Sequence, residues 1–264
     1  MARLRAGDAE RRLAHGPDFL EALARGLAVI EAFGPARRQM TLAEVARAVD
    51  LPRATARRAL LTLEALGHVE SDGRIFRLTP QVLRLAAAYL GSSAISTILQ
   101  PRCDRISAAT GEPCSAAVLD GPEIVFVAYG QPMRMVSLTP MLGVRLPAHC
   151  TALGRVLLAG MDDPALDAFM AGLRPQAMTP LTDLAPDSIR AAILAARAQG
   201  FSFVDQEAEE GFRSIAVPLT RADGRVVAAL NLGQRRERGT PAAMHARILP
   251  ILREAAAAIS AQLL

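Results

Sequence analysis

Residues 41–78 read TLAEVARAVDLPRATARRALLTLEALGHVESDGRIFRL. Thr41 and Glu44 have the spacing of a capping box at the start of a short helix. A tight turn then leads to a second helix, expected over about 53–66. Asp72-Gly73, flanked by alternating apolar residues, predicts a β-hairpin with a two-residue turn. Two short helices followed by a small hairpin are typical of a winged helix-turn-helix.

The flanking sequence suggests four segments. Residues 1–17 are polar and basic, and we interpret them as a flexible arm. Asp18 can cap a helix that opens the winged helix-turn-helix domain, residues 18–79. Residues 80–97 carry apolar residues on more than one helical face, which favours a linker helix and a partial dimer contact; packing against the domain's own first helix is the alternative. Residues 98–264 form a second domain.

Residues 98–264 alternate between strand-like and helical patterns. The expected strands are 115–119, 124–129, 134–138, 202–205, 214–218 and 226–232, and the expected helices are 98–110, 151–159, 164–171, 187–199 and 241–264. This order predicts an α+β domain with an antiparallel sheet.

The composition excludes several classes of protein. The chain has 264 residues, of which 51% are hydrophobic and 21% charged, so extensive disorder is not expected. No apolar run reaches the length of a membrane span, and the N-terminus lacks a secretion signal. Three widely spaced cysteines indicate neither a disulfide framework nor a metal site, and suggest the cytoplasm.

Positive charge is concentrated in the first third of the chain. Residues 1–90 contain 14 Arg and 10 Asp or Glu, a net charge of +4, whereas residues 91–264 contain 16 of each, a net charge of zero. This asymmetry favours a nucleic acid as the partner of the first domain, and the winged helix-turn-helix makes double-stranded DNA the expected one. A solvated basic surface is the alternative.

The start of the second helix is the expected groove-reading element. Arg53 and Arg57 share a helical face and can donate two hydrogen bonds to guanine, while Thr55 can contact a thymine methyl group or a phosphate. Arg58 is better placed for phosphate. The candidate DNA-contacting residues are Thr41, Arg53, Thr55, Arg57, Arg58, Arg74 and Arg77. Each arginine can instead be an ordinary exposed side chain.

Two long sequence segments in the second domain resemble those of a known protein family. Residues 143–159 read GVRLPAHCTALGRVLLA and residues 204–218 read VDQEAEEGFRSIAVP. Together with the winged helix, they resemble the IclR family of bacterial transcription regulators. Together with ATARR at 54–58, these two segments are similar to the sequences of the family branch that controls protocatechuate and 4-hydroxybenzoate catabolism in the β-ketoadipate pathway. The resemblance covers the chain from about residue 18 to its end.

The resemblance implies a GAF-like effector domain, a homodimer or dimer of dimers, and a small carboxylate effector such as protocatechuate, 4-hydroxybenzoate or a β-ketoadipate-like acid. The positions that it places around the effector are Leu138, Leu146, Ala152, Leu153, Phe212, Ser214, Asn231 and Gly233. Relatives that bind two- or three-carbon acids differ at Phe212, Ser214, Asn231 and Gly233.

Further candidates come from the residues themselves. Arg134 and Arg145 flank this region, and either can face a carboxylate, a surface salt bridge being the alternative. His149 and Thr151, on either side of Cys150, are further effector candidates. His149 can bind an effector hydroxyl or serve as a structural hydrogen bonder. Asp205 is a candidate at a strand end. Asp205 and Glu207 together could bind a metal ion, but we interpret them as residues that cap the end of a strand.

Three functions remain to be separated. The first is a ligand-responsive DNA-binding regulator. The second is an enzyme with an appended DNA-binding domain, but the sequence contains no HExxH, GxSxG or Walker A motif, so we expect neither catalysis nor a cofactor. Cys150 next to His149 could suggest a thiol nucleophile with its base, but the sequence offers no third residue to orient that pair. The third is a regulator whose second domain only dimerises.

Overall fold

The computed structural model describes residues 16, 18–34, 36–92, 94–132 and 142–263. The chain divides into two compact units, Met1–Tyr89 and Leu90–Leu264. The predicted arm at 1–15 and 17 and the predicted strand 134–138 lie outside the described residues.

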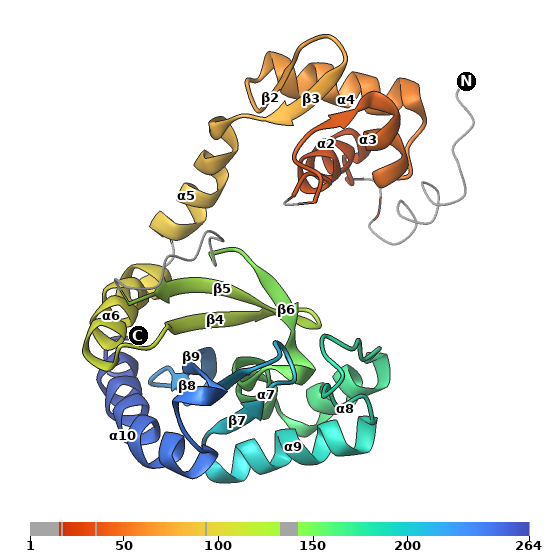
Figure 1. The fold of residues 1–264 in the computed structure, drawn as a ribbon. Helices are drawn as coiled ribbons and strands as arrows, with labels where there is room; N and C mark the ends of the chain where they lie inside the picture. Colours follow the sequence, from red (N-terminus) through yellow and green to blue (C-terminus); the bar gives the residue numbers. More distant parts are fainter. Residues whose placement is uncertain (1–15, 17, 35, 93, 133–141, 264) are drawn as a thin grey trace. The chain divides into compact units, whose positions relative to one another are not determined.

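The N-terminal unit is a winged helix-turn-helix (Figure 1). Its elements are α2 (Glu21–Glu31), β1 (Met40–Thr41), α3 (Leu42–Ala48), α4 (Arg53–Ala65), β2 (Val69–Ser71) and β3 (Ile75–Leu78). The strands form an antiparallel sheet in the order β1-β3-β2. Val29, Val45 and Leu60 are fully buried between the three helices and this sheet. The sequence had indicated β2 and β3 but not the two-residue strand β1.

Local chemistry explains where the helices of this unit begin. Thr41 caps α3 in a complete capping box: its hydroxyl accepts from the backbone N–H of Glu44, whose carboxylate accepts from the backbone N–H of Thr41. The expected cap at Asp18 was wrong, because α2 begins later, with Leu20 as its N-cap residue and no side-chain cap. Asp50 has a positive φ of 47° in the turn between α3 and α4.

The hairpin between β2 and β3 also differs from its prediction. Strand β2 ends at Ser71 and β3 begins at Ile75, so three residues connect them rather than two. Oδ1 of Asp72 accepts from the backbone N–H groups of Arg74 and Ile75, at 2.9 and 2.8 Å. Gly73 has a φ of +93°, and Asp72 stays at negative φ. Asp72 therefore forms a side-chain turn in place of the expected tight one.

The segment after the wing is helical. A short 3-10 helix, η1 (Pro80–Val82), leads into α5 (Leu83–Ser92), and α6 (Ala94–Thr110) follows. The division between the two units falls inside α5. Among the described helices, no single one is long and apolar enough to cross a membrane; Pro80–Gly91 and Ser96–Thr110 pass that test only as one bent pair.

The C-terminal unit contains a six-stranded antiparallel sheet in the order β6-β5-β4-β9-β8-β7. Its strands are β4 (Cys114–Asp120), β5 (Glu123–Gly130), β6 (Arg145–Pro147), β7 (Ser202–Asp205), β8 (Phe212–Thr220) and β9 (Val226–Arg235). Its remaining helices are η2 (Ala148–Cys150), α7 (Ala152–Ala159), α8 (Asp163–Gly172), α9 (Pro186–Gln199), η3 (Arg236–Arg238) and α10 (Pro241–Ser260). This confirms the predicted α+β class and adds β6.

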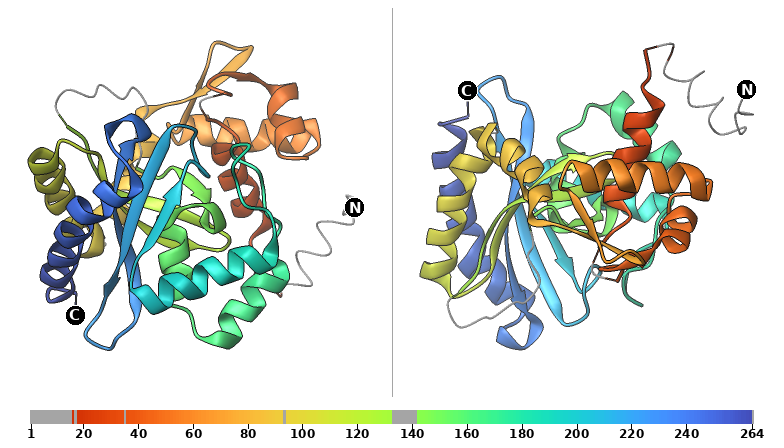
Figure 2. Two further views of the ribbon diagram at one scale, coloured as in Figure 1. Left: turned by 60° about the horizontal axis from the view of Figure 1, so that its bottom comes forward. Right: turned by 90° about the horizontal axis from the view of Figure 1, so that it is seen from above.

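The sheet separates two hydrophobic cores (Figures 1 and 2). Helices α6 and α10 lie side by side on one face, where Leu99, Leu230 and Ile248 are buried. Helices α7 and α9 cover the other face, where Ala216 and Ala229 of the sheet meet apolar residues of α7. The second face is the one that carries the candidate site.

Candidate functional site

The start of α4 presents two unpaired cations. Arg53 and Arg57 are exposed, and neither has an acidic partner within the described part of the chain. Thr55 lies two residues, or about 200°, from Arg53 around the helix. It is half-buried and lines a groove of about 490 Å³ between α2 and α4, together with Arg58. The structure therefore groups Arg53 with Arg57, but puts Thr55 on another face.

The other candidate DNA-contacting residues differ in whether they already have a partner within the protein. Arg74 is exposed at the tip of the wing. Nε of Arg77 lies 2.6 Å from Oε1 of Glu70 on the neighbouring strand, an exposed pair that competes only weakly with a phosphate. The hydroxyl of Thr41 donates to Glu44, at 2.8 Å, so its hydrogen bonds are used in capping α3.

The C-terminal unit contains a cavity of about 470 Å³ between the sheet and the start of α7. Predicted effector residues that line it are Leu146, Thr151, Ala152, Leu153, Phe212, Ser214, Asn231 and Gly233. Lining residues that the prediction missed include Ser115, Phe126, Tyr129, Glu209 and Arg235. A volume of this size suits a small organic molecule.

Strand register orders the cavity floor into rungs. Asn231, Gly233 and Arg235 alternate along β9 and so share one face. Asn231 pairs with Ser115 of β4, Gly233 with Ser214 of β8, and Arg235 with Phe212. Because β9 runs outward from the buried core at Ala229, Asn231 is the deep end and Arg235 the rim.

Gly233 provides the space for the Phe212 ring. A Cβ atom built on Gly233 would lie 2.2 Å from Cζ of Phe212 and 2.3 Å from Cε1. The ring therefore lies directly over the Gly233 backbone and forms an aromatic floor for the cavity. The glycine has no positive φ, so close approach, not backbone conformation, is what requires it.

The deep end of the cavity is polar but neutral. The buried hydroxyl of Ser115 donates to Oδ1 of Asn231 at 2.5 Å. No acceptor within the described residues is bonded to the amide nitrogen of Asn231, so this donor is available to a ligand. Burial raises the pKa of Tyr129, and the negative charge of Glu209 raises it further, so the phenol stays protonated at neutral pH.

Two predicted effector residues, Asp205 and Arg145, lie away from the cavity. Asp205 pairs with Arg213, at 2.8 Å, because the two are directly opposite each other on the face turned away from Phe212 and Ser214. Arg145 binds Asp120 and Glu123, both at 2.7 Å, which raises its pKa and confirms the salt-bridge alternative.

His149 is buried outside the cavity, and burial lowers its pKa. Arg134 and Leu138 lie outside the described residues. Within those residues, no group of three or more His, Cys, Asp or Glu side chains is arranged to hold a metal ion. Burial raises the pKa of Cys150 to about 11, which keeps its thiol protonated and unsuited to nucleophilic attack.

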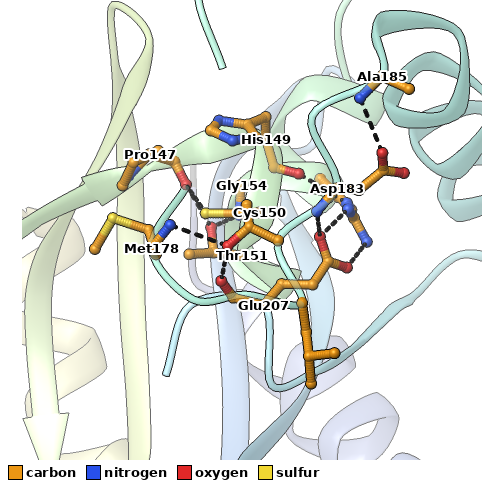
Figure 3. Close-up of polar contacts among 12 residues, drawn as sticks. Pro147, His149, Cys150, Thr151, Gly154, Met178, Asp183, Ala185 and Glu207 are labelled. Carbon is orange, nitrogen blue, oxygen red and sulfur yellow. Dashed lines mark hydrogen bonds and ion pairs between the residues drawn. The ribbon is translucent and has the colours of Figure 1, made fainter. Parts of the chain in front are cut away.

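A buried ion pair fastens the loop beside the cavity to α7. Nη1 and Nη2 of Arg155 lie 2.8 and 2.7 Å from the two carboxylate oxygens of Glu207, and Nε donates to the carbonyl of His149. Thr182 donates to the carbonyl of Glu207. The backbone N–H of Asp183 donates to the carboxylate of Glu207 (Figure 3). These bonds connect two walls of the cavity, the turn before α7 and the loop between β7 and β8.

We expect Gly233→Ala to destabilise the C-terminal unit by about 1–3 kcal/mol, because the added methyl group overpacks the floor. Phe212→Ala in the same chain should restore most of that loss, as measured by urea unfolding. Gly172→Ala is the control, since nothing lies within 4 Å of its Cβ position. Equal stability of Gly233→Ala and wild type would contradict the described floor.

Removing one partner of the buried ion pair should be more damaging than removing both. We expect Arg155→Met to cost about 3–5 kcal/mol because Glu207 is left buried without its partner, and Arg155→Met with Glu207→Leu to cost less. Urea unfolding measures both. The exposed pair of Arg190 and Asp167 is the control, where Arg190→Met should change stability by about 0–1 kcal/mol. Equal losses of unfolding free energy in Arg155→Met and Arg190→Met would contradict a buried ion pair between Arg155 and Glu207.

Comparisons with known proteins agree with this architecture. The model of the IclR helix-turn-helix domain matches residues 22–73, and that of the bacterial transcriptional regulator IclR C-terminal domain matches residues 87–261. The Pca regulon regulatory protein of Pseudomonas putida is 45% identical over 237 residues, which are 89% of this chain and 81% of that protein.

Solved structures give the same result. A transcriptional regulator from Rhodococcus sp. RHA1 is 44% identical, with a TM-score of 0.82 over 93% of this chain and 98% of that one. An IclR homologue from Microbacterium hydrocarbonoxydans, in complex with 4-hydroxybenzoate, is 28% identical, with a TM-score of 0.76 over 92% and 99% of the two chains. The family models and these relatives confirm the resemblance, and the chain belongs to the IclR family of bacterial transcriptional regulators.

Proposed function

We propose that this regulator binds operator DNA through α4 and the wing, and that a small aromatic carboxylic acid bound in the C-terminal cavity controls it. The observation that carries the effector class is the cavity itself: an aromatic floor at Phe212, apolar walls, and a few polar groups at its two ends. The Microbacterium relative was crystallised with 4-hydroxybenzoate, a molecule of this class.

The DNA contacts follow from the exposed cations of the first unit. Arg53 and Arg57 project from the first turns of the helix that enters the major groove in this motif, and they have no internal partner among the described residues. Arg57 is four residues after Arg53, so both can reach neighbouring base edges. Arg58 and Arg74 supply phosphate contacts from the flanks.

Operator recognition by a homodimer is the second part of the proposal. A single helix-turn-helix reads a short half-site, and two copies are the usual means of reading a longer operator. Leu23 and Leu27 of α2, Leu66 and Leu85 are exposed large apolar residues around the groove of the N-terminal unit. Such a patch favours burial against a second copy.

Replacing Arg53 or Arg57 with Ala should weaken operator binding by about 1–3 kcal/mol each if both contact bases. Fluorescence anisotropy with duplexes from the chain's own upstream region measures this, and sedimentation of the bound complex should find two copies per operator. Arg225→Ala, an exposed arginine of the other unit, is the control. Unchanged affinity in the double variant would remove these arginines from the interface.

The effector is tested by calorimetry of the wild-type protein with 4-hydroxybenzoate, protocatechuate and 3-hydroxybenzoate. We expect at least one acid to bind, and Phe212→Ala to weaken that binding while operator affinity without effector stays near normal. Loss of both activities would mean that Phe212 is a core residue. No binding of any acid would favour the alternative in which the C-terminal unit only dimerises.

A further inference from the structure

The cavity has one positive and one negative side chain among its described lining residues. These are Arg235, the last residue of β9, and Glu209, in the loop between β7 and β8. Nη1 of Arg235 lies 2.8 Å from Oε1 of Glu209, and we name these two residues the rim pair. The deep end at Ser115 and Asn231 carries no charge, so the rim is where this lining interacts most strongly with an anion.

The rim pair is built to be exchangeable. The side chains of Arg235 and Glu209 are 51% and 58% exposed, so their attraction is screened by water and the pair contributes little to stability. The guanidinium also lies over the ring of Phe212, 5.7 Å from its centroid. This cation–π contact keeps the Arg235 guanidinium beside the Phe212 ring whichever carboxylate it binds.

The rest of the loop is held independently of the rim pair. Arg155 binds the carboxylate of Glu207, and Thr179 and Thr182 donate to the carbonyls of Gln206 and Glu207. Among the described residues, the carboxylate of Glu209 has no ion-pair or hydrogen-bond partner besides Arg235, while the backbone carbonyl of Glu209 accepts from the N–H of Phe212. Losing the rim pair therefore frees the carboxylate of Glu209 without detaching the loop from α7.

The two ends of the cavity differ along β9, since Asn231 lies at the deep end and Arg235 at the rim, and this difference favours one orientation of an effector. Asn231 and Arg235 are four residues apart on β9, so their Cα atoms are about 13 Å apart. One aromatic ring resting on Phe212 fits between them. Its ring substituent then faces the free amide N–H group of Asn231 at the deep end, and its carboxylate faces the rim.

We propose that the effector's carboxylate takes the place of Glu209 on Arg235, so that the rim pair selects an anionic effector and opens when the effector binds. This inference rests on the proposed function. It makes Arg235 the residue that binds the carboxylate and Glu209 an internal competitor. A neutral analogue of the same shape competes poorly with Glu209, because its carbonyl oxygen accepts from Arg235 without the attraction between opposite charges.

The test compares 4-hydroxybenzoate and protocatechuate with their carboxamides, by calorimetry on the full chain. We expect Arg235→Gln to weaken acid binding about 10- to 100-fold, which corresponds to a lost charge-assisted hydrogen bond. Glu209→Gln should tighten acid binding about two- to fivefold, since it removes a competitor of exposed-pair strength. The carboxamides, whose carbonyl oxygen is a neutral acceptor, should lose much less affinity than the acids in Arg235→Gln.

The double variant should bind the acids as weakly as Arg235→Gln alone, because Glu209 acts only through Arg235. Arg225→Gln, an 84% exposed arginine at the other end of β9 that is paired with Asp223, should bind like wild type. Urea unfolding checks that all variants are folded.

Two results would overturn the inference, and they differ. Wild-type acid binding that is unaffected by Arg235→Gln would place the carboxylate elsewhere, for example on the N–H groups of Ala152 and Leu153 at the start of α7, and would leave the proposed function intact. Wild-type protein that bound none of the acids would refute the effector class, and this inference with it.

Discussion

The register between β8 and β9 is the constraint on which the cavity of the C-terminal unit depends. It places Ser214 opposite Gly233 and Phe212 opposite Arg235, so the residues of one sheet face form successive rungs. A shift of one residue would turn each of these side chains to the opposite face, into the core beneath α6 and α10. The register also brings the Phe212 ring over Gly233, where no side chain opposes it.

The same register determines which charges face the cavity. Arg213 lies between Phe212 and Ser214 in sequence and therefore points to the other face, where it binds Asp205. Arg235 continues the alternation of Asn231 and Gly233 and reaches the cavity rim. Two arginines in adjacent strands thus have different surroundings because of strand geometry alone: Arg213 pairs with Asp205, and Arg235 faces the candidate cavity.

Much of the fold followed from local patterns. The capping box at Thr41, the two helices of the motif and the helical and strand periodicities of 98–264 predicted both units, because these signals arise from neighbours in the chain. The turn at Asp72-Gly73 was placed correctly but assigned the wrong type, since the Asp72 carboxylate bonds to two backbone N–H groups. Strand β6 is three residues long and exists only because β5 pairs with it.

The candidate site was partly predictable. Arg235 could have been found by extending the period of two from Asn231 and Gly233, whereas Ser115 and Tyr129 come from strands far away in sequence. Residue types and spacing establish a helix-turn-helix, a basic first domain and the two segments that resemble the family, because such features depend on near neighbours. Which carboxylate each arginine meets depends on pairing over long sequence separations: Arg155 with Glu207, Arg145 with Asp120, Arg235 with Glu209. Only the folded chain brings those partners together, because strand order and helix packing set their distances.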